Sequence, residues 1–397
     1  MRLAIVTPFL DRRHGTERAF AELVERLARD YHCEIHLFSQ RVEDLPVTPW
    51  SRHRSAESGV IFWHRVPSAE GPLLFSFVFW YLLNRLCRWS FTFWHGAEFT
   101  LVLSPGVNCS DANVVIVHAI FHRLRELSQD HSEPTLQALC LFRRIHRQTY
   151  YALLTGLERR IYSNQRVTLA AVSKRTAAQL ASYFHRTDVR VVSNGVDTVL
   201  FSPLERLARR EQARDRRGFR TGDFVLLLIG NDWEVKGLAT ILRAMALLGD
   251  APLRLIVVGS DSPQAFQQLA QGLGVFGHCQ WEQPSSDVLD FYAAADVYVS
   301  PTREDSFGMP VAEAMACGLP VITSSDAGVS ELLHDGIDGF VLRDPLDVST
   351  LAKLLRLLHG QPELRERIGH SATQSALAWT WDRNAAAVWK LLNNRKG

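Results

Sequence analysis

Apolar runs alternate with amphipathic stretches along the chain. The first run, Met1 to Leu10, predicts a strand that stops at Pro8. After a charged loop, Thr16 is placed to cap a helix whose apolar residues recur at helical spacing, and the short run Glu34 to Ser39 predicts a second strand. A strand, a helix and a strand in this order predict a doubly wound α/β domain, in which ligands bind at the carboxyl ends of the strands.

The pattern then repeats and restarts. In the first half, further strands are predicted at Val60 to Val66, Leu101 to Leu103, Val114 to His118 and Leu169 to Val172. In the second half they are predicted at Val189 to Val192, Val225 to Ile229, Leu255 to Gly259, Val297 to Val299 and Val321 to Thr323. Nearly continuous apolar runs are typical of parallel strands covered on both faces. The sequence therefore predicts two α/β domains, followed by an amphipathic helix from Thr380 to Leu392.

Composition agrees with two folded domains and narrows the class of protein. A chain of 397 residues is too long for one core of ordinary size. A net charge of +2 argues against a general nucleic-acid binder. The six cysteines are scattered without zinc-site spacing, which predicts reduced thiols in a cytoplasmic protein. The apolar residues before Asp11 are too few for a signal peptide, so none is expected. The longest apolar stretch, Leu73 to Leu83, covers only about 16 Å, so no transmembrane helix is expected either.

Candidate chemistry concentrates in the stretch from Arg303 to Pro320. Asp305 and Glu313 lie eight residues apart, with the first before a predicted helix and the second in its first turns. Gly308, between them, leaves backbone N–H groups accessible at the start of that helix. A helix N-terminus carries unpaired donors and a partial positive charge, so it suits a phosphate, while carboxylates suit sugar hydroxyls. The stretch predicts a nucleotide-sugar site.

Several motifs in this order resemble glycosyltransferase family 4, the retaining enzymes of GT-B fold. They are Asn194-Gly195-Val196-Asp197 with Phe201 and Pro203, then Lys236-Gly237, then Asp305 to Glu313 continuing as EAMACGLPVI, and finally Gly328 to Phe340. The resemblance covers nearly the whole chain. It implies two Rossmann-like domains facing across a cleft: residues 1–187, with the helix of 380–397 returning, would bind the acceptor, and residues 188–379 would bind the nucleotide-sugar donor.

The resemblance also implies roles for individual residues. Lys236 would pair with the donor diphosphate, Glu313 would hold the ribose hydroxyls and Asp305 the hydroxyls of the donor sugar. Backbone N–H groups around Phe307, Gly308 and Met309 would bind the distal phosphate. From the first domain, His118 would face the donor sugar and Gly15 would lie in the loop that closes on the phosphate.

Two departures from the family pattern accompany this resemblance. Asp305 replaces the usual Glu, and Asn231 stands where the family commonly has Arg, as in the lipopolysaccharide core glucosyltransferase branch. Lys236 and the helix end would stabilise the leaving phosphate without a metal, and the chain has no Asp-x-Asp pair. Neither a metal nor a cofactor is therefore expected. The expected reaction moves a sugar to a hydroxyl of a glycan or lipid-linked acceptor, in cell-envelope polysaccharide or lipopolysaccharide synthesis.

A basic helical region, roughly Thr135 to Ser163, allows two interpretations. Arg143, Arg144 and Arg147 alternate there with apolar residues, as in helices that lie on the inner face of an anionic membrane, but a solvated helix has the same composition. For function, two alternatives to sugar transfer remain: a nucleotide-sugar epimerase of similar build and a noncatalytic nucleotide-sugar-binding partner. A hydride-transfer enzyme is disfavoured because the first strand-turn-helix lacks GxGxxG.

Overall fold

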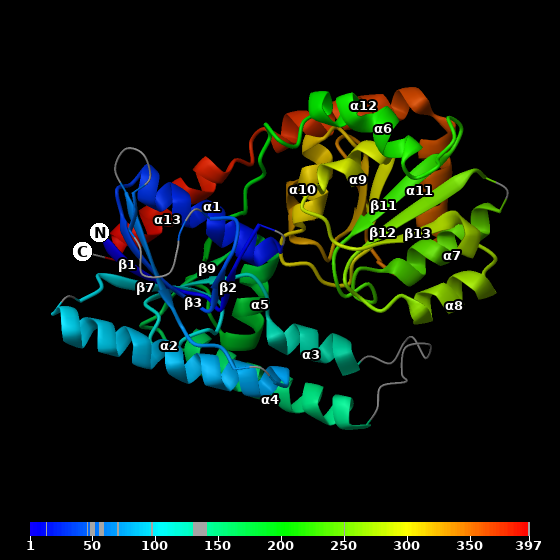
Figure 1. Cartoon of the computed structure of the whole chain (residues 1–397). Coiled ribbons are helices and arrows are strands. Elements are labelled where there is room, and N and C mark those ends of the chain that lie inside the picture. Colours follow the sequence, from blue (N-terminus) through cyan, green and yellow to red (C-terminus); the bar gives the residue numbers. More distant parts are fainter. Residues whose placement is uncertain are drawn as a thin grey trace. The chain divides into compact units, whose positions relative to one another are not determined.

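The structure is a computed structural model that describes residues 1–12, 14–45, 47, 52–54, 59–69, 71–96, 98–129, 141–249 and 251–395. The chain forms two compact units (Figure 1). Residues up to Gly195, together with those from Trp381, make the first unit, and Val196–Thr380 make the second. Each unit contains a twisted, mainly parallel sheet with helices on its faces, which confirms the predicted α/β class.

The sheet of the first unit has the order β10-β9-β8-β7-β1-β3-β6-β5, parallel except for the β5–β6 pair. Its strands are β1 (Arg2–Val6), β3 (Glu34–Ser39), β5 (Arg52–Arg54), β6 (Val60–Arg65), β7 (Leu101–Pro105), β8 (Val114–Val117), β9 (Thr168–Ala171) and β10 (Arg190–Val191); β2 (Phe9–Leu10) and β4 (Arg41–Val42) pair separately. Its helices are α1 (Gly15–Arg29), α2 (Leu73–His95), α3 (Phe121–Gln129), α4 (Leu141–Tyr162), α5 (Lys174–Phe184) and α13 (Trp381–Asn394).

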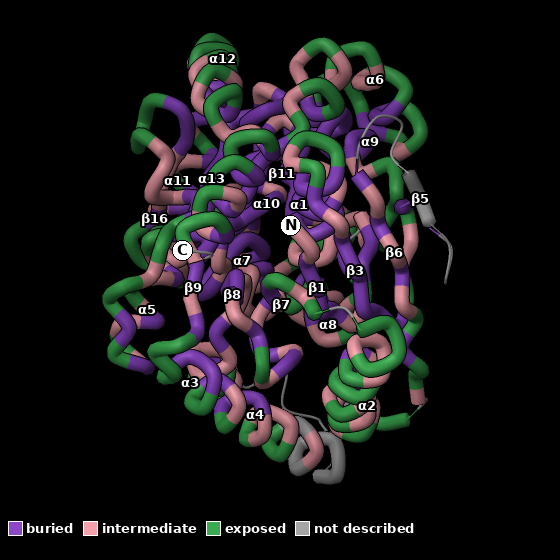
Figure 2. The backbone as a smooth tube through the Cα atoms, turned by 90° about the vertical axis from the view of Figure 1, so that its left-hand side faces the viewer, coloured by how far each residue is buried: buried purple, intermediate pink, exposed green. Residues whose placement is uncertain are grey.

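The order of these strands reverses beside β1. This strand pairs with β3 on one side and with β7 on the other, so the loops that leave β1 and β7 diverge at their carboxyl ends. In doubly wound sheets such a switch point is where ligands bind. Figure 2 shows β1 and β3 as largely buried, whereas α2 at the edge of the unit is mostly intermediate or exposed.

The C-terminal helix α13 packs against α1 in the first unit. Arg26 Nε donates to Asp382 Oδ1 at 2.7 Å, and the rings of Tyr31 and Trp389 lie 5.0 Å apart. Asn384 Nδ2 donates to the carbonyl of Ser193 at 2.8 Å, which ties the helix to the end of the first segment.

The second unit contains a six-stranded parallel sheet of order β13-β12-β11-β14-β15-β16. Its strands are β11 (Phe224–Ile229), β12 (Leu253–Val258), β13 (Cys279–Glu282), β14 (Val297–Ser300), β15 (Val321–Ser324) and β16 (Phe340–Leu342). Its helices are α6 (Pro203–Asp215), α7 (Leu238–Leu248), α8 (Gln264–Gly272), α9 (Leu289–Ala294), α10 (Met309–Ala316), α11 (Val348–Gly360) and α12 (Pro362–Ala376), with short 3-10 turns at Phe276–His278 and Gly328–Leu332.

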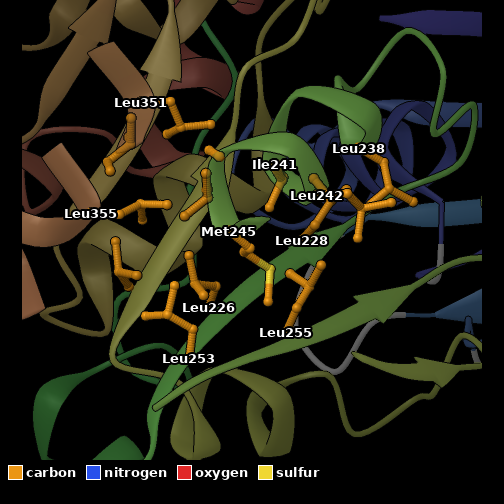
Figure 3. Packing of buried hydrophobic residues seen from close by; sticks show 14 of the residues in the cluster. Leu226, Leu228, Leu238, Ile241, Leu242, Met245, Leu253, Leu255, Leu351 and Leu355 are labelled. Atoms are coloured by element: carbon orange, nitrogen blue, oxygen red, sulfur yellow. The ribbon is translucent and has the colours of Figure 1, made fainter. Parts of the chain in front are cut away.

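Apolar side chains of β11 and β12 interlock with those of α7 and α11 to form the core of this unit (Figure 3). Leu226, Leu255, Ile241 and Leu355 are fully buried within it. Fully burying a side chain of this size stabilises the fold by about 1.5–3 kcal/mol. The core fixes β11 between β12 and β14, so the switch point of this sheet lies between β11 and β14.

Two predictions about the chain's organisation were wrong. Arg190–Val191 pairs with β9 in the first sheet, so the boundary falls after Gly195 and not after residue 187. Thr16 does not cap α1: the N-cap is His14, whose side chain makes no capping hydrogen bond, and the helix begins at Gly15.

The predicted membrane contact involves arginines whose side chains lie outside the described part of the chain. The backbone of α4 is described, but the side chains of Arg143, Arg144 and Arg147 are not. Within the described ranges, no helix combines the length and apolar character needed to span a bilayer.

Candidate functional site

The turn that follows β11 positions Lys236. Gly230 (φ 139°) and Asp232 (φ 61°) bend the chain, and Gly237 (φ 79°) is the N-cap of α7. A Cβ at Gly237 would lie 2.1 Å from the carbonyl oxygen of Pro301, so only glycine allows this close approach of the two loops. The Gly237 contact therefore places Lys236 directly beside the loop that leaves β14.

Backbone hydrogen bonds join these two loops. Arg303 N donates to the carbonyl of Val235 at 2.7 Å, and Thr302 Oγ1 donates to the same oxygen at 3.1 Å. Trp233 belongs to the turn after β11 and packs in the core against Trp281, which fixes this turn to the core of the second unit. The loops that carry Lys236 and Asp305 are thus held together by the fold of the second unit alone.

Lys236 and Asp305 form an ion pair at the switch point of the second sheet. Lys236 Nζ lies 2.5 Å from Asp305 Oδ2, and both side chains are less than one fifth exposed. Asp305 Oδ1 also accepts from Phe307 N at 3.3 Å. A ligand that carried both an anion and hydroxyl groups would separate this pair, taking the ammonium with its anion and the carboxylate with its hydroxyls.

The start of α10 lies next to this pair. Gly308 (φ 96°) is the N-cap, without a side-chain capping bond, so Asp305 is not the cap of this helix. A Cβ at Gly308 would lie 2.9 Å from Val329 Cγ1, which again requires glycine. Within the described chain, the N–H groups of Gly308 and Met309 donate to no protein acceptor, so they remain available to an anion.

Glu313 lies inside α10 and is 2% exposed, which excludes a solvated acid. Its Oε2 accepts from the hydroxyl of Tyr292 at 2.8 Å, and Tyr292 comes from α9. Burial, and then the charge of Glu313, raise the pKa of Tyr292 well above its usual value, so the phenol stays a donor at neutral pH. Sequence reasoning did not identify Tyr292, because its partner is 21 residues away in the chain.

Asn231, at the position where the family commonly has arginine, has a structural hydrogen bond. Its Oδ1 accepts from Ser260 N at 2.9 Å, after β12. The next residue, Asp232, donates its N–H to Asp261 Oδ2 at 2.9 Å. These bonds fix the turn after β11 to the neighbouring strand end, and Lys236 is the residue of that turn that meets Asp305.

In the first unit, a cavity of about 310 Å³ lies at the carboxyl ends of β1, β3, β7 and β8. His118 lines it directly after β8, with Nδ1 3.3 Å from the carbonyl oxygen of Ile116. Burial lowers the pKa of His118 to about 4, and the Ile116 carbonyl offsets this only partly, so the ring is neutral at pH 7. Gly15 is not a loop residue but begins α1, next to Thr16 and Glu17 in the cavity wall.

Two family models match the chain, one in each half. The model described as "Glycosyltransferase Family 4" matches residues 13–200, and that described as "Glycosyl transferases group 1" matches residues 209–375. The chain belongs to this family of glycosyltransferases. The two matches together span both units and include every site residue predicted above.

Relatives of known name agree with this assignment. D-inositol 3-phosphate glycosyltransferase of Thermomonospora curvata is 34% identical over 59% of this chain and 58% of its own length. Lipopolysaccharide glucosyltransferase WaaG of Escherichia coli K12 is 32% identical over 44% of each chain. The chain thus spans about half the length of the curated relatives it matches.

Solved structures extend the similarity to the whole chain and show its fold. A crystal structure of WaaG superposes with a TM-score of 0.77 at 19% identity, covering 98% of this chain and 99% of that one. Anabaena HepE in complex with UDP-glucose superposes with a TM-score of 0.68 at 16% identity, covering 99% and 100%. The fold is therefore GT-B, as the sequence predicted.

The second unit alone brings one group of the predicted site residues together. Lys236, Asp305 and Glu313 lie with Asn231 and the Phe307-Gly308-Met309 turn around the carboxyl ends of β11 and β14. The Asn194-Gly195-Val196-Asp197 motif has a structural role. Asp197 Oδ1 accepts from Val199 N and Leu200 N, and these bonds form a turn just after the boundary between the two units. His118 and Gly15 belong to the first unit.

The described residues contain no group of three or more His, Cys, Asp or Glu side chains placed to hold a metal ion. The donor set around Lys236 is a cation with backbone N–H groups, which suits a phosphate directly. The folded chain adds three residues that the sequence did not predict. They are Tyr292 in the second unit, and Glu17 and Trp80 in the cavity of the first unit.

Proposed function

We propose that this protein is a glycosyltransferase that moves a sugar from a nucleotide diphosphate to a hydroxyl of a glycan or lipid-linked acceptor, with retention at the anomeric carbon. The observation that carries the proposal is the Lys236–Asp305 pair at the switch point of the second sheet, beside the open N-terminus of α10. A nucleotide sugar matches this arrangement. Its phosphates would bind the Lys236 ammonium and the N–H groups at the start of α10, and its hydroxyl groups would bind the carboxylates of Asp305 and Glu313.

In this proposal each group acts on one part of the donor. Glu313, oriented by Tyr292, would hold the ribose hydroxyls, and Asp305, released from Lys236, would hold those of the sugar. Lys236 and the N–H groups of Gly308 and Met309 would stabilise the charge that develops on the departing phosphate, with no metal or further cofactor. His118, neutral and at the cavity edge, would contact the donor sugar from the first unit.

The acceptor and cellular setting follow from the relatives and remain proposals. WaaG acts in lipopolysaccharide biosynthesis by its name, which supports a role in cell-envelope glycan synthesis. A place on the cytoplasmic side of the membrane stays a prediction from the sequence. Membrane contact through Arg143, Arg144 and Arg147 stays a prediction, because their side chains lie outside the described part of the chain.

The test is a transfer assay with a panel of UDP-, GDP- and ADP-sugars and a cell-envelope lipid extract as acceptor. Lys236→Ala and Glu313→Ala should each reduce transfer by at least two orders of magnitude. The matched controls Lys353→Ala and Glu366→Ala, at exposed positions of α11 and α12, should leave it unchanged. Full transfer by both site variants would refute the proposal, and donor conversion without any acceptor would favour an epimerase.

A further inference from the structure

The short link between β8 and α3 carries His118. β8 ends at Val117 and α3 begins at Phe121, and His118 is the first residue of the link. His118 and Ala119 line the first-unit cavity, as does Phe121 itself. The sheet fixes one end of the link, because β8 pairs with β7 on one side and with β9 on the other. The position of the His118 ring therefore depends on how firmly the N-terminus of α3 is held at the other end.

A carboxylate from a different helix holds that N-terminus. Glu158 of α4 accepts from Phe121 N at 2.6 Å through Oε1 and from His122 N at 3.0 Å through Oε2. These are the first two N–H groups of α3, which have no acceptor within the helix itself. The carboxylate also lies at the positive end of the helix dipole, and α4 packs against α3 (Figure 1). Glu158, 37 residues away in the chain, therefore does what an N-cap side chain does locally.

His122 adds a third donor to the same carboxylate. Its Nδ1 lies 2.6 Å from Glu158 Oε2, and Arg159 Nε donates to its Nε2 at 3.2 Å. Because Nε2 accepts, the proton of the neutral ring is on Nδ1, which donates to Glu158. Burial, and then the charge of Arg159, lower the pKa of His122 and favour this neutral form. Burial raises the pKa of Glu158, whereas the N–H groups of Phe121 and His122 oppose that rise, so the carboxylate depends on these bonds to keep its charge.

The burial of Glu158 indicates why the cap comes from α4. Its side chain is fully buried, and a buried carboxylate is destabilising unless donors satisfy it. A polar residue in place of Ile120, directly before α3, would be the usual cap. Ile120, however, is 3% exposed and packs in the core of the first unit. The link that includes His118 is thus apolar at the position where a local cap would stand, and α4 supplies the missing acceptor.

The same side of α4 also reaches the cavity. Tyr150, Leu154 and Glu158 follow one another at four-residue spacing, which places them on one side of the helix. Tyr150 and Leu154 line the cavity, and Glu158 lies one turn further along, at the start of α3. One helix therefore forms part of the cavity wall and fixes the link that carries His118.

We propose that Glu158 is a positioning residue for His118: its carboxylate holds the start of α3 and thereby keeps the His118 ring at the cavity edge. This inference rests on the proposed function for the part that His118 plays in sugar transfer. The anchoring of α3 by Glu158 does not require transfer and is measured separately.

The first experiment measures amide hydrogen exchange in the parent chain and needs no substitution. First-turn N–H groups of a helix have no acceptor within the helix and ordinarily exchange quickly. The N–H groups of Phe121 and His122 should instead exchange at least about a hundredfold more slowly than unprotected amides, because Glu158 accepts from both. Exchange of both groups at the unprotected rate would overturn the proposal.

Two variants then test the carboxylate itself. Glu158→Gln keeps the shape of the side chain but replaces one oxygen by an NH2 group, which cannot accept. It should speed the exchange of both N–H groups at least about tenfold and shift the NMR signals of the His118 ring. Glu126→Gln, the matched control, changes an exposed carboxylate of the same helix α3 and should do neither.

The second experiment is a double-mutant cycle on sugar transfer. If Glu158 acts through His118, Glu158→Gln should lower kcat at least about tenfold in the parent chain but less than about twofold in the His118→Gln chain. Glu126→Gln should leave kcat unchanged. Affinity for the nucleoside diphosphate, which the second unit is proposed to hold, should be the same in all variants. A purely structural role would lower kcat by the same factor in both backgrounds.

The outcomes distinguish this inference from the proposed function. Equal losses of kcat in the two backgrounds, or transfer at the parent rate by Glu158→Gln, would remove the inference alone. Slow exchange in the parent chain and shifted His118 signals in Glu158→Gln, without sugar transfer from any donor, would leave the anchoring standing and remove the proposed function.

Discussion

Tyr292→Phe tests whether the Tyr292 hydroxyl positions Glu313, because the substitution removes only that hydroxyl group. The hydroxyl of Tyr292 donates to Glu313 Oε2 at 2.8 Å, and Glu313 is 2% exposed. A hydrogen bond to a charged group is worth about 1.5–3 kcal/mol. In a unit of this size 1 kcal/mol corresponds to a shift in Tm of about 2–4 °C, so Tm of the second unit should fall by about 3–12 °C.

Tyr298→Phe is the matched control. Tyr298 is also buried, but its hydroxyl donates to the neutral carbonyl of Ile229 at 3.2 Å, a bond worth about 0.5–1.5 kcal/mol. If Glu313 binds ribose, Tyr292→Phe should also weaken nucleoside diphosphate binding about tenfold, equivalent to about 1.4 kcal/mol, whereas Tyr298→Phe should not. Scanning calorimetry and titration calorimetry measure the two effects. Equal Tm shifts with unchanged affinity in both variants would refute the role given to Tyr292.

Two further predictions concern backbone and pH. Gly237→Ala should lower the free energy of unfolding by more than about 3 kcal/mol in urea titrations, because φ is 79° and the new Cβ would lie 2.1 Å from Pro301 O. Gly96→Ala, in the same left-handed region (φ 57°, ψ 24°) but with no atom within 4 Å of the new Cβ, should lower it by only about 1–2 kcal/mol, and equal losses would contradict the close-approach argument. The pKa of His118 is about 4 in the folded chain and about 6.5 unfolded, so the unfolded state binds the extra proton between these values. The free energy of unfolding should therefore rise with pH across this window by more in the parent than in His118→Gln, and identical pH slopes would contradict a His118 ring held neutral in the cavity wall.

The sequence predicted the second unit well because its motifs follow buried strands. The apolar run before Lys236 and the one before Asp305 fold into adjacent parallel strands, so both loops leave the sheet at the same edge. The Asp305–Lys236 contact itself could not be predicted, since it depends on Gly237 meeting Pro301 across 64 residues. Tyr292 was missed for the same reason: it comes from a six-residue helix without a recognisable motif.

The first unit was harder to predict from sequence. The cavity combines the ends of four strands with side chains from α1, α2, α3 and α4, and its polar atoms are spread from Thr7 to Tyr150. The dense aromatic sequence of α2 gave no indication of which residues face inward. Only the folded helix separates Trp80, which is buried, from Trp89, which is exposed.

The central claim is that Lys236, Asp305 and Glu313 form the donor half of a retaining sugar transferase. The most direct measurement is the anomeric configuration of the product, determined by NMR after transfer from the nucleotide sugar that the panel identifies, for the parent chain and for Lys236→Ala. The account predicts a product with the configuration of the donor and a loss of transfer of at least two orders of magnitude in Lys236→Ala. An inverted product, or undiminished transfer by Lys236→Ala, would contradict it.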